Sequence, residues 1–325
     1  MSTVGIIGGG QLAQLLAISA YQLGLKTLCL VEDENCPAKR VSPVFMGSLE
    51  DFAHQVDVIT VENENIDIDF LNKLNKIKPV FPSPAIIQVS QDRLLEKNYF
   101  KKCGIPTVDF FEVTSAQDLK NYHGILKTRR LGYDGKGQIR LTDKSDINEI
   151  WNDFQKPAIV ESFCNFETEV SQIIARNAKG NIAFFPLIEN KHESGILRTS
   201  QFSQLKHLDK LAQDYAKKIA ESLDYTGILS VEFFVKNNQL MINEIAPRVH
   251  NSGHLTIEGC NVSQFEQHLR AILNVELIQP KIIQKVLMQN IIGTWPKDLS
   301  QFQHIYDYGK APRQNRKLGH VIQIL

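Results

Sequence analysis

Apolar and polar positions over the first sixty residues predict three short strands and one helix. The mainly apolar run Val4–Ile7 fits a buried strand, and Gln11–Leu23 has apolar residues at helical spacing before Gly24. Two further apolar runs, Thr27–Val31 and Asp57–Val61, fit strands. Strands that alternate with helical patterns are typical of a parallel sheet, so we expect an open α/β domain at the N-terminus.

The pattern farther along the chain mixes helices and strands. Apolar residues at helical spacing predict four helices: Gln91–Cys103, Ile147–Phe154, Leu208–Leu223 and Ser263–Leu273. A strand is expected at Ala158–Phe163. Proline-containing segments at Pro79–Pro84 and Val275–Lys281 interrupt these patterns and mark two domain boundaries.

The clearest pattern is a pair of apolar strands joined by a short polar segment. The strands Leu229–Val235 and Leu240–Ile245 are rich in β-branched and aromatic residues, and each contains one carboxylate, Glu232 or Glu244. A two-residue turn would place these carboxylates on opposite faces of the hairpin. A three-residue turn, Asn237–Gln239, would place them opposite each other with Cβ atoms about 5 Å apart.

The register of this hairpin decides whether it can hold a metal ion. Two carboxylates this close repel each other unless a cation or a shared proton lies between them, and oxygen ligands suit Mg²⁺. Both acids share one face only if the turn has an odd length or a strand contains a bulge. We expect Glu232 opposite Glu244, Phe234 opposite Ile242 and three residues in the turn. The alternative is an ordinary solvated hairpin with two acids on its polar face.

Two glycine-rich turns are candidate phosphate sites. Gly8–Ala13 fits G-x-G-x-x-A, with Glu32 about twenty residues farther on as in a dinucleotide site, although a tight turn that only packs helix on strand is the alternative. Leu131–Gln138 contains three glycines whose amides could fold over a triphosphate. Lys127 and Lys136 would supply positive charge there, and a plain hairpin turn is the alternative.

Charged residues gather at two other places. Glu62 follows a strand at the sheet edge where open α/β folds bind ligands, although a surface acidic loop explains it equally well. The segment Tyr306–His320 is locally basic, with Lys310 and Arg316 among its cations. Such a patch after a glycine turn suits a phosphate group.

Composition limits the classes of function. Lys+Arg and Asp+Glu balance at 36 each, so no net charge attracts nucleic acid or an acidic membrane. No apolar run approaches the ~18 residues of a transmembrane helix, and no charged leader precedes an apolar stretch. We expect a soluble, cytoplasmic protein. The five cysteines show no paired spacing and fit reduced thiols.

Several motifs resemble those of one superfamily. NEIAPRVHNSGH resembles the closing segment of the ATP-grasp ligases of purine biosynthesis, and the loop at Leu131–Gln138 resembles their GGYDGKGQ loop, with Leu131 replacing the first Gly. GGGQL, TVENEN and GKAPRQNRKLGH resemble further motifs of these enzymes, in order along essentially the whole chain. Asn63 replaces a usually apolar residue, and Gln314-Asn315 replaces Pro-Gly. The combination resembles the N5-carboxyaminoimidazole ribonucleotide synthetases.

This resemblance implies a fold and a reaction. The fold would be α/β and α+β. A Rossmann-like pre-ATP-grasp domain would span residues 1–90, and an ATP-grasp domain would span 91–280 with a flap at about 105–165. A small C-terminal β-rich segment, 281–325, would close the substrate site. Such enzymes use MgATP and bicarbonate to carboxylate 5-aminoimidazole ribonucleotide through carboxyphosphate. The resemblance also implies a homodimer, and the balanced charge already argues against a nucleic-acid or membrane partner.

The resemblance also assigns roles to the motif residues. Catalytic roles fall to Arg248, His250 and Lys136, and metal ligation falls to Glu232 and Glu244. Arg248 would stabilise the charge on bicarbonate and carboxyphosphate, and His250 would be a base or orienting group. The ATP-binding residues would be Arg93, Lys127, Gly132, Tyr133, Asp134, Gly135, Lys136, Gly137, Gln138, Glu161, Ser162, Phe163, Cys164, Glu169, His192, Asn243 and Glu244. The ribonucleotide-binding residues would be Gly10, Gln11, Leu12, Glu62, Tyr133, Arg248, His250, Asn251, Ser252, Lys310 and Arg316.

Three other functions stay open. A formate-using glycinamide ribonucleotide transformylase would share the ATP half and differ in the small substrate. The turn at Gly8–Ala13 also allows an NAD-dependent dehydrogenase, although such an enzyme needs neither the second glycine loop nor the acid pair. A non-catalytic nucleotide sensor is the third, and the intact acid pair weakens it.

Overall fold

A parallel five-stranded sheet forms the N-terminal part of the computed structural model, which describes residues 2–120, 122–132, 135–154 and 156–325. The strands lie in the order β3 (Val44–Phe45), β2 (Lys26–Leu30), β1 (Thr3–Ile7), β4 (Val58–Val61) and β5 (Val80–Phe81). The helices around it are α1 (Gln11–Gln22), α2 (Leu49–His54) and α3 (Ile68–Asn75). Neighbouring strand residues enter different cores, Val58 with α1 and Ile59 with α2 and α3, so both faces of the sheet are covered. The predicted open α/β domain is confirmed.

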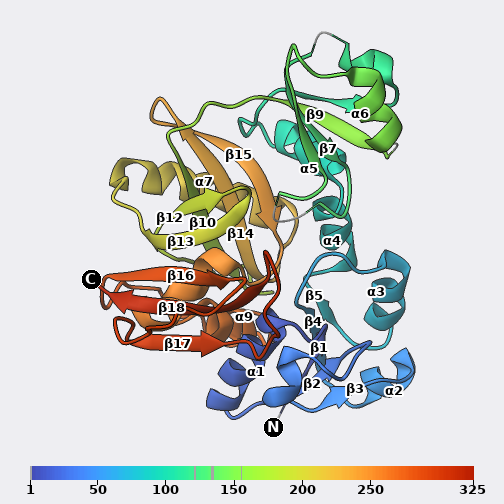
Figure 1. Ribbon diagram of the computed structural model, residues 1–325. Coiled ribbons are helices and arrows are strands. Elements are labelled where there is room, and N and C mark those ends of the chain that lie inside the picture. The colour runs from blue at the N-terminus through green and yellow to red at the C-terminus, as the bar shows by residue number, and fades with distance from the viewer. Residues whose placement is uncertain (1, 121, 133–134, 155) are drawn as a thin grey trace.

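A separate antiparallel sheet stands above this domain in Figure 1. Helices α4 (Pro84–Ser90) and α5 (Arg93–Lys102) lead up to it. Its strands lie in the order β6 (Phe110–Val113), β9 (Ala158–Ser162), β7 (Gly124–Thr128) and β8 (Gln138–Leu141). Helix α6 (Ile147–Phe154) packs on it over a small core of its own. The second glycine loop connects β7 to β8 and therefore projects from the end of this subdomain.

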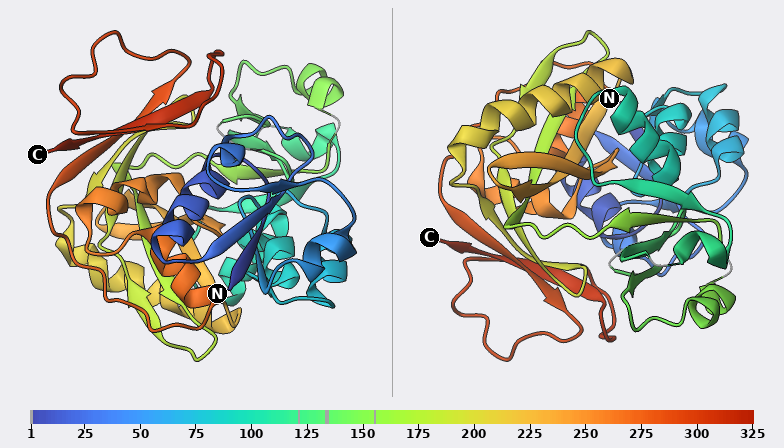
Figure 2. Two further views of the ribbon diagram at one scale, coloured as in Figure 1. Left: turned by 90° about the horizontal axis from the view of Figure 1, so that it is seen from below. Right: turned by 90° about the horizontal axis from the view of Figure 1, so that it is seen from above.

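A nine-stranded sheet forms the centre of the molecule. Its main path runs through β15 (Gln239–Ala246), β14 (Gly227–Lys236), β10 (Thr168–Arg176), β12 (Ile188–Glu193), β13 (Ile196–Phe202), β16 (Val286–Ile292), β18 (Lys317–Ile324) and β17 (His304–Asp307), and β11 (Ile182–Phe184) pairs with β10. The helices that accompany it are α7 (Asp209–Ser222), α8 (Thr256–Gly259) and α9 (Gln264–Ile272). The C-terminal strands β16 to β18 thus extend the central sheet, and Figure 2 shows them along one side of the molecule.

The turn of the β14–β15 hairpin differs from the prediction. Lys236 pairs with Gln239, which leaves a two-residue turn of Asn237 and Asn238. Both asparagines have positive φ, 52° and 57°, as the tight turn that matches the twist of two strands requires. The predicted three-residue turn is therefore wrong, because asparagine tolerates this backbone conformation without the help of an extra residue.

A β-bulge in β15 restores the pairing of the two acids. Phe233, not Phe234, lies opposite Ile242, so that predicted pair is wrong. The register shifts between Glu232 and Phe233, and Asn243 becomes the extra residue on β15. Glu232 then lies opposite Glu244, which confirms the central prediction for this hairpin. The extra residue that aligns the two acids was expected in the turn, but it lies within strand β15.

Two further observations concern the cysteines and the helices. All five cysteines are free thiols. None of the described helices is both long and apolar enough to cross a membrane.

Candidate active site

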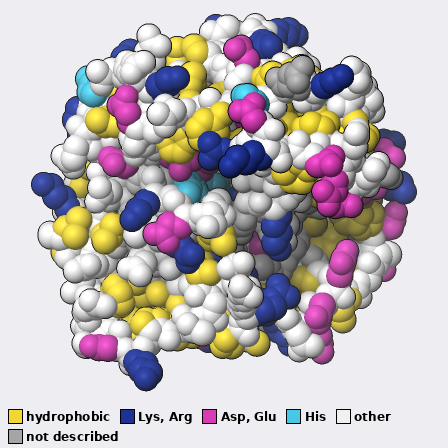
Figure 3. All heavy atoms as spheres, turned by 45° about the horizontal axis from the view of Figure 1, so that its top comes forward, with side chains coloured by type: hydrophobic (Ala, Val, Ile, Leu, Met, Phe, Trp, Pro, Cys, Tyr) yellow, Lys and Arg dark blue, Asp and Glu magenta, His cyan; other side chains and the backbone are white. Residues whose placement is uncertain are grey.

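One cavity of about 1450 Å³ lies where the three sheets meet. It is lined from the N-terminal domain by Gly10, Gln11, Leu12 and Glu62, from the flap subdomain by Lys127, Gly132, Lys136 and Gln138, and from the central sheet by Glu169, His192, Glu232, Asn243 and Glu244. In the space-filling view of Figure 3, Lys and Arg side chains border a hollow in which histidine is visible. Candidate residues from separate parts of the sequence therefore line one cavity.

The acid pair is partly buried, and the charged form of Glu232 is disfavoured. Burial, together with the neighbouring carboxylate of Glu244, raises the pKa of Glu232 to about 8. Among the described residues no group of three or more His, Cys, Asp or Glu could hold a metal ion. A cation here would depend on Glu232, Glu244 and oxygens from phosphate or water, a ligand set that fits Mg²⁺.

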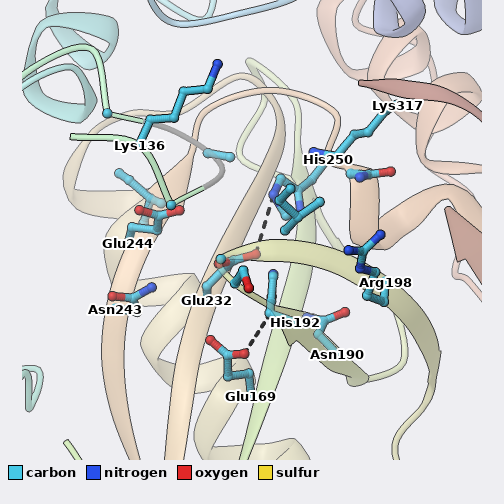
Figure 4. A pocket seen from close by; sticks show the side chains of 18 of the residues that line it. Lys136, Glu169, Asn190, His192, Arg198, Glu232, Asn243, Glu244, His250 and Lys317 are labelled. Atoms are coloured by element: carbon cyan, nitrogen blue, oxygen red, sulfur yellow. Dashed lines mark hydrogen bonds and ion pairs between the residues drawn. The ribbon is translucent and has the colours of Figure 1, made fainter. Parts of the chain in front are cut away.

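His250 contacts this pair from the segment that follows β15. Its Nε2 lies 3.4 Å from Glu232 Oε1, and its Nδ1 hydrogen-bonds Ser252 Oγ at 2.8 Å, as Figure 4 shows for the first contact. Burial, and then the positive charge of Arg248, holds the pKa of His250 well below its usual value. His250 is therefore a neutral imidazole with one nitrogen aimed at the acid pair.

Arg248 forms an ion pair that joins two domains. Its Nε and Nη2 donate to the two carboxylate oxygens of Glu64 at 2.5 and 3.0 Å. Burial alone would raise the pKa of Glu64, but the guanidinium of Arg248 outweighs it and the pKa is lowered. Arg248 lines the cavity, so it can present only the part of its guanidinium that Glu64 does not bind.

Glu62 binds backbone amides of the first glycine turn. Its carboxylate accepts hydrogen bonds from Gly10 N at 2.6 Å and Ala13 N at 3.1 Å. A Cβ added at Gly10 would lie 2.7 Å from a Glu62 oxygen, so glycine is needed for this approach. The helix amides that bind pyrophosphate in a dinucleotide site already bind a carboxylate here. Glu32 is exposed and is not among the residues that line the cavity.

Two lysines flank the carboxylate of Glu161. Lys127 Nζ lies 2.7 Å from Glu161 Oε2, and the fully buried Lys97 lies 3.4 Å from Oε1. Burial would raise the pKa of Glu161, but the two ammonium groups outweigh it and hold the pKa at about 2. The sequence analysis missed Lys97, because a lysine in the middle of a helix pattern gives no sign of being buried.

The second glycine loop faces the cavity. Arg93, predicted to reach a phosphate, donates to the carbonyl oxygens of Thr128 and Gly132, both at 2.9 Å. Leu131 has φ of +63°, so it occupies the left-handed conformation that the glycine of the related motif would adopt freely. A Cβ at Gly135 would lie 2.7 Å from Ser194 O, so the loop approaches the β12–β13 turn closely. Tyr133 and Asp134 lie outside the described residues.

Only some of the residues predicted to bind adenine and ribose line the cavity. Glu169 Oε2 hydrogen-bonds His192 Nδ1 at 2.6 Å (Figure 4). Although burial lowers the pKa of His192, this hydrogen bond and the nearby acids raise it overall. Both residues line the cavity, together with Phe166 and Phe234, whose rings stack at 4.6 Å and which the sequence analysis missed. The predicted residues that are not part of the cavity lining are Gly137, Glu161, Ser162, Phe163, Cys164 and Ser252.

The basic C-terminal segment reaches the N-terminal domain. Lys310 Nζ donates to Gln11 Oε1 at the start of α1, and Arg316 also lines the cavity. Asn315, which replaces a glycine of the related motif, has φ of +59° and so keeps a glycine-like turn. Further lining residues that the sequence analysis did not assign include Asn190, Arg198, Arg313 and Lys317 (Figure 4 labels three of them).

Among the predicted site residues, Asn251 most clearly lacks a hydrogen-bond partner in the part of the chain that the structure describes. Both polar atoms of its side chain are buried without a hydrogen bond among the described residues, and it lines the cavity. Buried polar groups are normally satisfied. Its amide is therefore available to a ligand.

Comparison with protein families identifies the class to which this fold and site belong. The model of the ATP-grasp domain matches residues 98–265, that of the ribonucleotide synthetase preATP-grasp domain matches 1–91, and that of the phosphoribosylaminoimidazole carboxylase C-terminal domain matches 286–324. The protein is an ATP-grasp ligase, and the predicted fold class is confirmed.

Individual relatives define the family within that class. The chain is 41% identical to the N5-carboxyaminoimidazole ribonucleotide synthase of Brucella melitensis over 99% of this chain and 96% of the relative. It is 42% identical to the bifunctional purine synthesis protein purC/E of Dictyostelium discoideum, of which it spans 37%. The chain therefore belongs to the N5-carboxyaminoimidazole ribonucleotide synthase family.

Solved structures of similar proteins support the same family assignment. The synthetase of Thermus thermophilus superposes with a TM-score of 0.92 at 37% identity, covering 99% of this chain and 93% of the other. The Staphylococcus aureus synthetase complexed with ADP gives 0.93 at 34% identity, covering 100% and 93%. The Aspergillus clavatus synthase in complex with ADP and 5-aminoimidazole ribonucleotide gives 0.88 at 29% identity, covering 100% and 94%.

Proposed function

We propose that this protein carboxylates 5-aminoimidazole ribonucleotide to N5-carboxyaminoimidazole ribonucleotide with ATP and bicarbonate, in purine biosynthesis. Family membership supports the reaction. The single observation that supports the chemistry is the shared cavity, which joins the acid pair and glycine loop to the basic C-terminal segment and Glu62. A triphosphate fits the first group, and a phosphorylated small substrate fits the second.

The first step would activate bicarbonate. A bicarbonate oxygen attacks the γ-phosphorus of ATP, the bond to the β-phosphate oxygen breaks, and ADP leaves carboxyphosphate behind. Lys127, Lys136 and the loop amides would bind and orient the phosphates. Glu232 and Glu244 would hold Mg²⁺, which supplies charge neutralisation to the triphosphate when bound.

The second step would transfer the carboxyl group. The amino nitrogen of the ribonucleotide forms the new C–N bond, inorganic phosphate leaves, and the nitrogen loses a proton. His250 is neutral and fixed by Ser252, so it can accept or orient that proton. Arg248, held in place by Glu64, would stabilise the anionic carboxyl group. The glycine loop would exclude water, which otherwise hydrolyses carboxyphosphate.

The ribonucleotide phosphate would bind near Lys310 and Arg316. Glu62 already occupies the amides of Gly10 and Ala13 at the start of α1, so those two amides do not bind a phosphate. This also argues against a dinucleotide cofactor. We expect calorimetry to detect no NAD binding. Tight NAD binding that Gly10→Val abolishes would overturn the ligase proposal.

A homodimer is part of the same proposal, as the family resemblance implies. Light scattering coupled to size-exclusion chromatography would measure the mass in solution. A monomer at working concentration would contradict it.

The deciding experiment measures ADP release and product formation while substrates are omitted one at a time. We expect ADP release to need ATP and bicarbonate and to rise when 5-aminoimidazole ribonucleotide is added, with carboxylated product formed. If formate and glycinamide ribonucleotide support turnover instead, the protein is the formate-using ligase. If no combination releases ADP although nucleotide binds, it is a sensor.

A further inference from the structure

Helix α9 contains three polar side chains that are completely buried. Gln264, Gln267 and His268 are each 0% exposed, and burying such groups is costly unless they are hydrogen-bonded. None of the three lines the cavity. Their hydrogen bonds show what they do.

Gln264 binds both backbone polar groups of His250. Its Oε1 accepts from His250 N at 2.8 Å, and its Nε2 donates to His250 O at 2.6 Å. A Cβ added at Gly253 would lie 2.4 Å from Gln264 Oε1, so the loop also needs its glycine to admit this side chain. The position of His250, and hence of its contact with Glu232, is fixed from α9.

His268 links α9 to the N-terminal sheet. Its Nδ1 accepts from Ile228 N at 3.1 Å, and its Nε2 lies 2.8 Å from Thr60 Oγ1. A backbone N–H can only donate, so Nδ1 has no proton and the neutral ring donates from Nε2 to Thr60. Thr60 in turn donates to Phe81 O at 2.7 Å. The hydrogen bonds from Ile228 to His268, from His268 to Thr60 and from Thr60 to Phe81 therefore fit a single placement of the protons.

These two contacts join opposite halves of the cavity. Gln264 and His268 are four residues apart, so they lie on one face of the helix. Gln264 holds the His250 segment beside the acid pair. His268 holds Thr60, which is two residues before Glu62 on the ribonucleotide side. A single helical turn therefore connects the segment beside Glu232, which would hold the metal ion of ATP, to Glu62 on the ribonucleotide side.

We propose that Gln264 and His268 are positioning residues that set the spacing between the two halves of the cavity, so that ATP is consumed only where the ribonucleotide can receive the carboxyl group. This inference rests on the proposed function. Because carboxyphosphate reacts with water, a small displacement of one half relative to the other would release ADP without product. Misplacement of reacting groups by about 1 Å can cost roughly 100-fold in rate.

Gln267 provides a matched control on the same helix. It binds a peptide unit in the same way, with Nε2 donating to Ile278 O at 2.5 Å and Oε1 accepting from Ile278 N at 3.3 Å. It is equally buried, but Ile278 does not line the cavity. Gln264→Met and Gln267→Met therefore remove the same kind of contact and differ in what that contact holds.

The experiment compares four variants of the full chain by product formed per ADP released, KM for each substrate and Tm. We expect Gln264→Met and Thr60→Val to lower product per ADP at least twofold and to raise the ribonucleotide KM about tenfold. We expect Gln267→Met to keep both values, whatever its loss of Tm. Thr60→Ser retains the hydroxyl and should behave as wild type.

A purely structural role for α9 would give a different result. If Gln264→Met and Gln267→Met lose Tm alike while product per ADP stays at the wild-type value, the inference is wrong. Should Gln264→Met not fold, the Thr60→Val and Thr60→Ser pair decides alone. If the wild type forms no product, the proposed function fails. The inference is then judged by calorimetry with the ribonucleotide, and equal affinity in the two glutamine variants would overturn it.

Discussion

At the scale of single residues, the site contains carboxylates whose charged form depends on neighbouring charges. Glu232 and Glu244 lie opposite each other in a partly buried position, and burial together with Glu244 raises the pKa of Glu232 to about 8. Glu161 shows the opposite result, because Lys97 and Lys127 overcome the effect of burial and lower its pKa. His192 and Arg248 lower the pKa of Glu232 only in part, so it stays raised, and a metal ion between the two acids would improve the electrostatics further.

Replacing one acid separates the fold from the chemistry. In Glu244→Gln the repulsion on Glu232 is relieved, so we expect an unchanged or higher Tm without ligands. Carboxylation should fall by at least about 100-fold, since even outer partners of a metal cost roughly 10–100-fold when lost. The rise in Tm produced by MgADP should disappear while ribonucleotide binding is kept. A variant that retains turnover and the MgADP shift would contradict the metal-pair proposal.

At the scale of elements, the β14–β15 hairpin shows how backbone irregularity serves the site. Its turn at Asn237 and Asn238 obeys ordinary turn geometry, and the bulge at Asn243 corrects the register. As a result Asn243 and Glu244, which are neighbours in sequence, both line the cavity. A regular strand would turn one of them away.

The turn itself is open to test. Asn238→Gly should raise the free energy of unfolding by up to about 1 kcal/mol, because glycine adopts positive φ without the Cβ penalty. Asn238→Val should lower it by about 1–2 kcal/mol. Urea denaturation measures both, and activity should stay at the wild-type level because the turn lies away from the cavity lining. A stable valine variant would contradict the two-residue turn.

The basic C-terminal segment is the second element with a testable role. Lys310→Ala and Arg316→Ala should each weaken ribonucleotide binding by about 1.5–3 kcal/mol, the cost of a hydrogen bond to a charged group, with no change in the KM for ATP. Lys297→Ala, at an exposed lysine outside the cavity lining, is the control. The assignment is wrong if the tail variants change the KM for ATP and leave that for the ribonucleotide.

At the scale of the whole molecule, two buried histidines matter, and one of them, His268, lies where two sheets join. His254 and His268 are fully buried, and burial lowers their pKa values to about 3 and about 4. His268 connects the N-terminal sheet to the central sheet. The assembled fold therefore requires these rings to be neutral, which links the docking of the domains to pH.

This linkage gives stability a definite sign with pH. Between about pH 6.5 and pH 4 the unfolded chain binds a proton at His268 that the folded chain does not, so stability falls as pH falls through that window. Each such histidine contributes at most about 1.4 kcal/mol per pH unit. Denaturation at pH 7 and pH 5 should show a smaller difference for His268→Asn than for wild type. His54→Asn, at an exposed histidine, should leave the difference unchanged; equal slopes in all three would refute the linkage.

Much of the architecture follows from local patterns along the chain. The strands β1, β2 and β4 and the helix α6 lie within a residue or so of the predicted ranges, because strands buried on both faces give continuous apolar runs and a helix buried on one face gives a helical period. The motif residues around Gly132, Glu232 and Arg248 were also identified from the sequence, since they lie within short runs of unusual composition. Local periodicity and local chemistry need no knowledge of the rest of the fold.

What only the tertiary structure decided are the contacts between residues distant in sequence. Thr60 and His268 are 208 positions apart, and Glu62 meets Gly10 across 52. No periodicity predicts that a carboxylate closes the first glycine turn, that Lys97 pairs with Glu161, or that the hairpin places its odd residue in the strand. Those outcomes depend on which buried polar groups find partners once the sheets have packed, and that choice is made by the whole fold at once.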